Sequence, residues 1–214
     1  MSADLKSTNT LSHTAARQVV LASSNPGKLR EISELLFGLD LQVIPQSDLG
    51  ITDAPETGLT FVENAIIKAR NASHHSGLPA IADDSGLEVD ALNGAPGIYS
   101  SRYAGDSASD EENVEKLLAD LADVPEYLRI ARFQCVMVYM AHENDPTPVI
   151  CEGTWEGSIL FSSRGTNGFG YDPVFNVPTH VCSSAELPAE VKNLLSHRGQ
   201  ALRKLLNRLK NRKL

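Results

Sequence analysis

The chain has no apolar run approaching the roughly 18 residues that a membrane-spanning helix requires. Its first segment, Met1 to Arg17, contains no hydrophobic stretch of the kind that marks a secretory signal. We therefore expect neither a leader nor a membrane anchor, and no membrane partner. The Ser, Thr, Asn and Ala content of residues 1–17 predicts a mobile tail that precedes the fold.

Cysteine is scarce, with three residues at Cys135, Cys151 and Cys182. Their number is odd and none forms a Cys-x-x-Cys pair, so the sequence predicts free thiols in a reducing compartment and hence a cytoplasmic protein. The six histidines include no His-x-x-x-His pair of the type that holds zinc on a helix. These absences argue against a zinc enzyme.

Positive charge is in deficit, because 19 Lys and Arg residues stand against 27 Asp and Glu residues, for a net charge of −8. A general nucleic-acid binder usually presents a net basic surface. We therefore expect no nucleic-acid partner. A small phosphorylated ligand is compatible with this balance if positive charge is concentrated locally.

The length of 214 residues is enough for one substantial domain, or for two lobes that share a core. Residues 18–23 have the apolar pattern of a buried strand, followed by turn residues and by helical spacing from Leu29. Residues 41–44 predict a second strand. Thr60 and Ser109 each open a capping-box pattern ahead of a helix.

The second half of the chain begins with two long β-rich runs, over residues 130–141 and 149–161, with turn residues between them. They predict a hairpin. Helical patterns follow over residues 189–195 and from Gly199 onward. Helices and strands that alternate early, with long adjacent strands later, favour an α/β fold with a mixed sheet, in two lobes around a cleft.

The acidic segment from Ile81 to Asp90 is the strongest functional signal. Asp83 and Asp84 follow an apolar run, and carboxylates are seldom buried unless they are paired or hold a metal. We therefore expect a divalent-cation site at a strand end, with Ser85 and Gly86 in a tight turn. Mg²⁺ is often held by one or two carboxylates together with substrate phosphates. The alternative is a solvated acidic turn.

Residues 23–28, Ser-Ser-Asn-Pro-Gly-Lys, lie between the first strand and the first helix. Backbone N–H groups and the helix dipole attract anions there, and Lys28 adds a full positive charge. The spacing is not that of a Walker A motif, and an ordinary helix entry is an equal alternative. Nearby, Glu56 is free to join Asp84 at a metal, whereas Glu63 is better explained as a helix cap.

Two further segments could contact a ligand. Phe169, Gly170, Tyr171 and Asp172 place aromatic rings beside glycines, as base stacking would require, although a turn with core aromatics is the alternative. Residues 196–199, Ser-His-Arg-Gly, offer hydrogen-bond donors for base carbonyl oxygens, or form a helix junction. The basic residues Arg203, Lys204, Arg208, Lys210, Arg212 and Lys213 are expected to form the solvated face of an amphipathic helix.

Taken together, these segments resemble the motifs of the inosine triphosphate pyrophosphatase family, whose members hydrolyse deaminated purine nucleoside triphosphates. The resemblance runs from about Val19 to the C-terminal helix. The motifs that carry it, in order, are Ser23 to Lys28, Glu56 to Gly58 with Glu63 to Ala65, Ala82 to Leu87, Gly94 to Tyr103, Gly168 to Pro173 and Ser196 to Gly199.

The resemblance implies an elongated α/β fold, as a single two-lobed domain over residues 18–214, and a homodimer. It also implies hydrolysis of inosine, deoxyinosine and xanthosine triphosphates to the monophosphate and pyrophosphate with Mg²⁺. Asp84 would be the general base and a metal ligand, and Glu56 the second metal ligand. The substrate-binding residues would be Ser23, Ser24, Asn25, Pro26, Gly27, Lys28, Ser85, Phe169, Gly170, Tyr171, Asp172, Lys192, His197 and Arg198.

This sequence departs from the family pattern at Cys182, where Lys is common, and at Asn167, where Gly is common. We expect His197 or Arg198 to donate to the 6-oxo group that distinguishes inosine from adenosine. Glu88 and Asp90 are expected to be structural or solvated, and Asp83 to support Asp84. The alternatives are a pyrophosphatase for other modified nucleotides, and a module that senses nucleotides without hydrolysing them.

Overall fold

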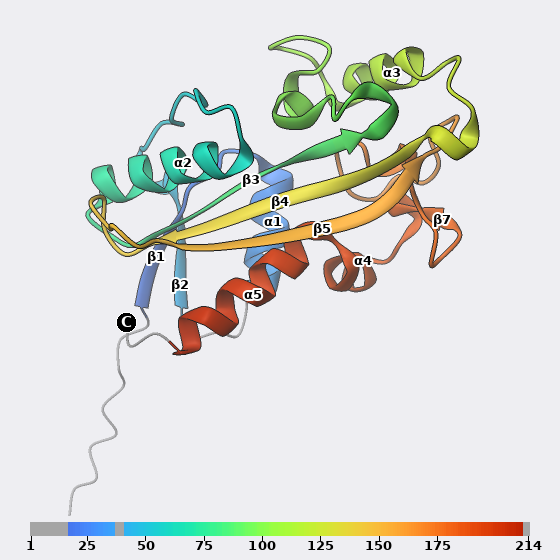
Figure 1. The fold of residues 1–214 in the computed structure, drawn as a ribbon. Helices are drawn as coiled ribbons and strands as arrows, with labels where there is room; N and C mark the ends of the chain where they lie inside the picture. The colour runs from blue at the N-terminus through green and yellow to red at the C-terminus, as the bar shows by residue number, and fades with distance from the viewer. Residues whose placement is uncertain (1–16, 37–40, 212–214) are drawn as a thin grey trace, which may run out of the picture.

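The structure is a computed structural model that describes residues 17–36 and 41–211. The predicted tail lies outside the described residues except for Arg17, which begins the first strand. Within the described ranges, seven strands form one sheet in the order β2-β1-β3-β4-β5-β6-β7 (Figure 1). The strands are β1 Arg17–Leu21, β2 Leu41–Pro45, β3 Ala80–Val89, β4 Ile130–Met140, β5 Val149–Ile159, β6 Phe175–Val177 and β7 Cys182–Ser183.

The sheet is mixed, which confirms the predicted fold class. β1 runs parallel to both β2 and β3, whereas the pairs from β3 to β7 are antiparallel. The predicted hairpin is formed by β4 and β5, which pair from Ile130 with Ser158 to Tyr139 with Val149. Asp145 stabilises its turn, because its carboxylate accepts hydrogen bonds from the N–H groups of Ala141 and Thr147.

Two helices begin at the caps that the sequence predicts, Thr60 and Ser109. Thr60 Oγ1 accepts from the N–H of Glu63, and Ser109 forms a complete capping box with Glu112. Asn25 Oδ1 accepts from the N–H of Lys28. The α-helices are α1 Pro26–Leu36, α2 Phe61–Ser76, α3 Asp110–Asp120, α4 Ala189–Leu195 and α5 His197–Asn211. The 3₁₀ helices are η1 Gln46–Leu49, η2 Asp90–Leu92, η3 Gly97–Arg102, η4 Glu126–Leu128, η5 Asp172–Val174 and η6 Ser184–Glu186.

Helices cover both faces of the sheet at one end of the long strands, with α2 on one face and α1 and α5 on the other (Figure 1). Ala65 and Ala69 of α2 pack with Ala82 and Val138, whereas Ile32 of α1 and Leu205 of α5 pack with Ile81 and Met137. At the other end of the strands a third cluster surrounds Phe133, Trp155 and Phe175 and includes residues of α3. The core therefore divides into separate clusters along the long strands.

The expectation that Asp83 and Asp84 lie at a strand end beside a tight turn was wrong, because both lie in the middle of β3. β3 pairs with β4 from Ala80 to Val89, whereas its pairing with β1 in the described residues covers only Ala80 and Ile81. Gly86 makes no turn. It admits η3 instead, since a Cβ at Gly86 would lie 2.3 Å from the carbonyl oxygen of Gly97.

The basic face of α5 differs in part from the prediction. Lys204 and Arg208 are exposed, yet each donates to a backbone carbonyl of β5, at Glu152 and Ile150. Gln200, one turn earlier, donates to the carbonyl of Thr154. Four residues of helix advance the chain about as far as two residues of strand, so the three side chains follow one strand edge. Arg212 and Lys213 lie outside the described residues. No helix within residues 17–36 and 41–211 combines the length and apolarity needed to cross a bilayer.

Candidate active site

A pocket of about 420 Å³ opens where β1 ends and β3 continues. Such a position, beyond the carboxyl end of a parallel strand, is where open α/β sheets commonly bind ligands. Every predicted substrate-binding residue except Pro26 and Gly27 lines this pocket, as do both predicted metal ligands, Glu56 and Asp84. Gly27 lies behind the lining, and a Cβ there would be 2.6 Å from the Phe169 ring.

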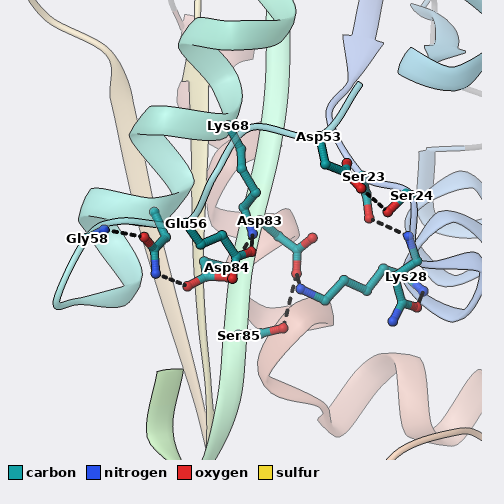
Figure 2. A network of polar contacts seen from close by, with 12 residues as sticks. Ser23, Ser24, Lys28, Asp53, Glu56, Gly58, Lys68, Asp83, Asp84 and Ser85 are labelled. Atoms are coloured by element: carbon teal, nitrogen blue, oxygen red, sulfur yellow. Dashed lines mark hydrogen bonds and ion pairs between the residues drawn. The ribbon is translucent and has the colours of Figure 1, made fainter. Parts of the chain in front are cut away.

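Asp84 and Glu56 meet at a single lysine that was not among the predicted site residues. Lys68 Nζ lies 2.7 Å from Asp84 Oδ1 and 3.0 Å from Glu56 Oε1 (Figure 2). Asn64, one turn earlier on α2, donates to Asp84 Oδ2 at 3.4 Å. Arg102 Nη1 lies 3.2 Å from the other oxygen of Glu56. Two carboxylates from a loop and a strand are thus held by cations from α2 and η3.

Burial raises the pKa of Asp84 above its ordinary value, and the charges of Lys68 and Lys28 oppose this without cancelling it. Burial would also raise the pKa of Glu56, but Lys68 and Arg102 hold it below its ordinary value. Burial lowers the pKa of Lys68, yet the surrounding carboxylates of Asp84, Asp83 and Glu56 raise it overall. Asp84 is therefore the better proton acceptor of the two pocket carboxylates.

Asp83 projects from the opposite face of β3, toward α1 and α5. Its Oδ2 lies 3.0 Å from Lys28 Nζ and 3.5 Å from Arg198 Nε, and it accepts from Ser85 Oγ at 3.2 Å. Burial would raise the pKa of Asp83, but the charges of Lys28, Arg198 and Lys68 hold it well below its ordinary value. Asp83 therefore stays ionised and acts as the shared counter-ion of two cations that line the pocket.

The same network extends through Glu31, which was not among the predicted site residues. Glu31 accepts from Lys192 Nζ at 2.7 Å and from Arg198 Nη1 at 2.5 Å. Lys192 also lies 2.5 Å from Asp172. A signal for Glu31 was present, because it stands four residues before Leu35 and beside Ile32, on the apolar face of its helix. Lys68 carried the same signal, since Ala65 and Ala72 flank it on the buried face of α2.

Residues 23–28 are tied to the loop that carries Glu56. Ser24 Oγ donates to Asp53, and Gln46 Nε2 donates to the other oxygen of the same carboxylate. Ser23 Oγ accepts from the N–H of Asn25 at 3.3 Å. These contacts fix the chain where it enters α1, with Lys28 pointing into the site (Figure 2). Asp53 lines the pocket as well and had not been predicted.

Aromatic rings line another part of the pocket. Lys192 Nζ lies 5.1 Å and the Arg198 guanidinium carbon 5.5 Å from the centre of the Phe169 ring. His197 stacks on Phe133 with ring centres 4.7 Å apart and an interplanar angle of 12°. Burial lowers the pKa of His197 well below its ordinary value, so the ring is neutral. Its buried Nδ1 has no hydrogen-bond partner among the described residues.

The loop that carries Phe169 is held by Asp172. The carboxylate of Asp172 accepts from the N–H of Phe169 at 2.9 Å and from Ser184 Oγ at 2.8 Å. The two departures from the family pattern lie outside the pocket lining. Asn167 donates to the carbonyl of Leu187 at 3.4 Å, and Cys182 packs against the cluster around Phe133.

The acidic residues that were predicted to be structural or solvated have partners away from Asp84 and Glu56. Glu63 accepts from the N–H of Leu59 at the start of α2, Glu88 accepts from Gln134 and Asp90 pairs with Arg132. Among the described residues no three His, Cys, Asp or Glu side chains are grouped as a metal site. Glu56 and Asp84 nevertheless fit Mg²⁺, because this ion is commonly bound by two carboxylates and completed by water and phosphate.

The chain is similar to known proteins over most of its length. The chain is 59% identical over 193 residues to the dITP/XTP pyrophosphatase of Vibrio parahaemolyticus, covering 90% of this chain and 96% of that protein. The structure of a HAM1 protein from Coxiella burnetii superposes with a TM-score of 0.85 at 53% identity, covering 92% of this chain and all of that one. The Ham1 protein of Staphylococcus aureus gives a TM-score of 0.81 at 43% identity over 91% of this chain and 99% of its own. The sequence profile of the Ham1 family matches residues 19–208. The chain therefore belongs to the Ham1 family.

Proposed function

We propose that this protein hydrolyses deaminated purine nucleoside triphosphates, namely inosine, deoxyinosine and xanthosine triphosphates, to the monophosphate and pyrophosphate. Such an activity would cleanse the nucleotide pool. The observation that carries the proposal is one pocket that joins a carboxylate pair, Glu56 and Asp84, to an aromatic site at Phe169. The same pocket is lined by His197, whose buried Nδ1 has no hydrogen-bond partner in the described part of the chain. The names of the relatives, dITP/XTP pyrophosphatase, support it.

The triphosphate would bind at the entry to α1. Ser23, Ser24, Asn25 and Lys28 all line the pocket there, and a helix N-terminus directs its N–H groups toward anions. The Lys28 ammonium already faces an anion, Asp83, at 3.0 Å. Neutralising and positioning phosphate oxygens is the main task of a protein in phosphoryl-type hydrolysis.

Glu56 and Asp84 would hold Mg²⁺, which when bound neutralises phosphate charge and acidifies water. Asp84 would orient the attacking water and accept its proton at a carboxylate oxygen. The raised pKa of Asp84, caused by burial, brings this carboxyl closer to the pH at which it works. Asn64 donates to Asp84 Oδ2 and so sets the orientation of the carboxylate.

The purine would stack on Phe169, with His197 and Arg198 reading its edge. A neutral His197 presents one N–H and one acceptor nitrogen, and Arg198 keeps N–H groups beyond those given to Asp83, Glu31 and Ser85. A donor that faces the 6-oxo group of hypoxanthine would face an amino group in adenine and go unpaired. Such a mismatch can reduce turnover by about two to five orders of magnitude.

Two other functions remain as competitors. A pyrophosphatase for other modified nucleotides would use the same carboxylates with different base contacts. A sensor that only binds nucleotide would need Lys28 and the helix entry but no carboxylate pair in the pocket. The proposal also includes a homodimer and a cytoplasmic location, the latter supported by three cysteines that are all free thiols.

The deciding experiment is pyrophosphate release from a panel of purine and modified pyrimidine triphosphates, with and without Mg²⁺. The proposal predicts Mg²⁺-dependent release that favours inosine, deoxyinosine and xanthosine triphosphates over adenosine and guanosine triphosphates. Preference for a modified pyrimidine would support the first competitor. Nucleotide binding without release from any member of the panel would support the second.

A further inference from the structure

The ammonium of Lys68 lies between the two carboxylates that we propose hold Mg²⁺. Its distances to Asp84 Oδ1 and Glu56 Oε1 are 2.7 and 3.0 Å, and the lysine side chain is only 12% exposed. Figure 2 shows the lysine extending from α2 to both carboxylates. A cation supplied by the protein itself therefore joins Glu56 and Asp84 in this structure.

The two carboxylates need such a cation. Asp84 is fixed in the middle of β3, whereas Glu56 comes from the loop before α2, and the two side chains are 7% and 28% exposed. Two partly buried negative charges that share one pocket repel each other unless a positive charge offsets them. Of the two carboxylates Arg102 contacts only Glu56, at Oε2, so among the described cations Lys68 is the one that bridges both.

A divalent ion would require the same oxygen atoms. Mg²⁺ binds oxygen at about 2.0–2.1 Å, which is shorter than either distance to the Lys68 ammonium. An ion with two positive charges placed within about 4 Å of an ammonium is strongly repelled in a partly buried site. Lys68 and the metal therefore compete for Glu56 and Asp84. A bound triphosphate would offer the ammonium new oxygen partners.

We propose that Lys68 is a placeholder cation. In the nucleotide-free protein it neutralises Glu56 and Asp84 and keeps metal affinity low, and it moves to phosphate oxygens when nucleotide and metal enter together. The inference rests on the proposed function, because it takes Glu56 and Asp84 as the metal carboxylates. It makes metal binding dependent on nucleotide through a single side chain.

The test is a titration of the nucleotide-free, full-length protein with Mn²⁺, in which free Mn²⁺ is measured by electron paramagnetic resonance. Removing the ammonium in Lys68→Met should tighten Mn²⁺ binding about tenfold or more. Lys68→Gln, which removes the charge but keeps a hydrogen-bond donor, should do the same and serves if the methionine variant folds poorly. Added Mg²⁺ should displace the bound Mn²⁺.

Two matched controls separate the local charge from other effects. Lys68→Arg keeps a cation at the site and should stay within about threefold of the wild-type affinity. Lys116→Met makes the same change in net charge on α3, where Lys116 pairs with Asp120, and should leave the affinity unchanged. Equal or weaker Mn²⁺ binding by both uncharged variants at Lys68 would overturn the placeholder role.

Pyrophosphate release by the wild-type protein separates this inference from the proposed function. If the wild type hydrolyses inosine triphosphate with Mg²⁺ and neither uncharged variant binds Mn²⁺ more tightly, the placeholder role alone fails. If the wild type releases no pyrophosphate with any metal, the proposed function fails and the placeholder role fails with it.

Discussion

Asp83 and Asp84 are neighbours in sequence whose carboxylates lie on opposite faces of β3 (Figure 2). Asp83 Oδ2 lies 3.0 Å from Lys28 Nζ, and Asp84 Oδ1 lies 2.7 Å from Lys68 Nζ. β3 thus contributes the central carboxylate of two separate ion-pair networks, one on each face of the sheet. The network on the Asp83 face reaches Arg198 and the aromatic site, whereas the network on the Asp84 face holds Glu56.

Asp84→Asn should remove the proton acceptor while keeping the size and shape of the side chain. We expect kcat to fall by about two to four orders of magnitude, the usual contribution of a general base. Affinity for inosine triphosphate should change little, because Lys28 and Phe169 are untouched. Pyrophosphate release gives the first quantity and isothermal titration calorimetry the second. Near-wild-type turnover by this variant would exclude Asp84 as the base.

Asp83→Asn should mainly reduce stability, because Lys28 and Arg198 lose their shared counter-ion. The Asp83 side chain is fully buried, and breaking a buried ion pair costs about 3–5 kcal/mol. The measurement is the free energy of unfolding in urea. Asp90→Asn is the matched control, since its pair with Arg132 is exposed and should contribute about 1 kcal/mol or less. Similar losses in both variants would contradict the assignment.

Arg198→Ala should reduce the preference for inosine over adenosine triphosphate, measured as the ratio of kcat/KM values. A hydrogen-bond donor that reads the 6-oxo group can contribute about a hundredfold or more to this ratio. Arg203→Ala on the same helix is the control, because Arg203 donates to α4 backbone carbonyls and does not line the pocket. Thermal unfolding of both variants shows whether the fold is intact. An unchanged preference in folded Arg198→Ala would leave His197 as the candidate reader.

Glu31 should make stability depend on pH in the acid range. Burial would raise the pKa of Glu31, but Arg198 and Lys192 hold it below the ordinary value of 4.5. The unfolded chain therefore takes up a proton at Glu31 before the folded protein does. The stability that Glu31 contributes is present above pH 4.5 and is lost as the pH falls through the lowered pKa of the folded state.

Glu31→Gln should accordingly be less stable than the wild type by about 2 kcal/mol at pH 7, and this difference should shrink as the pH falls below 4.5. Urea denaturation between pH 3 and 7 gives both quantities. Glu34→Gln, an exposed position on the same helix, should parallel the wild type throughout. A difference for Glu31→Gln that is independent of pH would show that the carboxylate charge is not responsible.

Local patterns in the sequence predicted most of the fold. The caps at Thr60 and Ser109 and the turn between β4 and β5 depend on neighbouring residues alone, and they are found where expected. The course of β3 was mispredicted because Asp83, Asp84 and Gly86 disfavour a strand locally. The negative charges of Asp83 and Asp84 are offset by cations from three helices, namely Lys28, Lys68 and Arg198. No local pattern in the sequence reveals these contacts.

The same limit applies to the candidate site. Residues whose own chemistry stands out, such as Asp84, Phe169 and Arg198, were named from sequence, and the structure brings them to one pocket. Glu31 and Lys68 were missed because each lies within a helix whose sequence pattern otherwise predicts ordinary packing against the core. Charged residues on a buried helix face were the available signal.

The most direct test of the account is ³¹P NMR of the products formed from inosine triphosphate by the wild-type protein with Mg²⁺. We predict inosine monophosphate and pyrophosphate in equal amounts, with much slower turnover of adenosine triphosphate. Inosine diphosphate and inorganic phosphate as the products, or equal turnover of the two nucleotides, would contradict it.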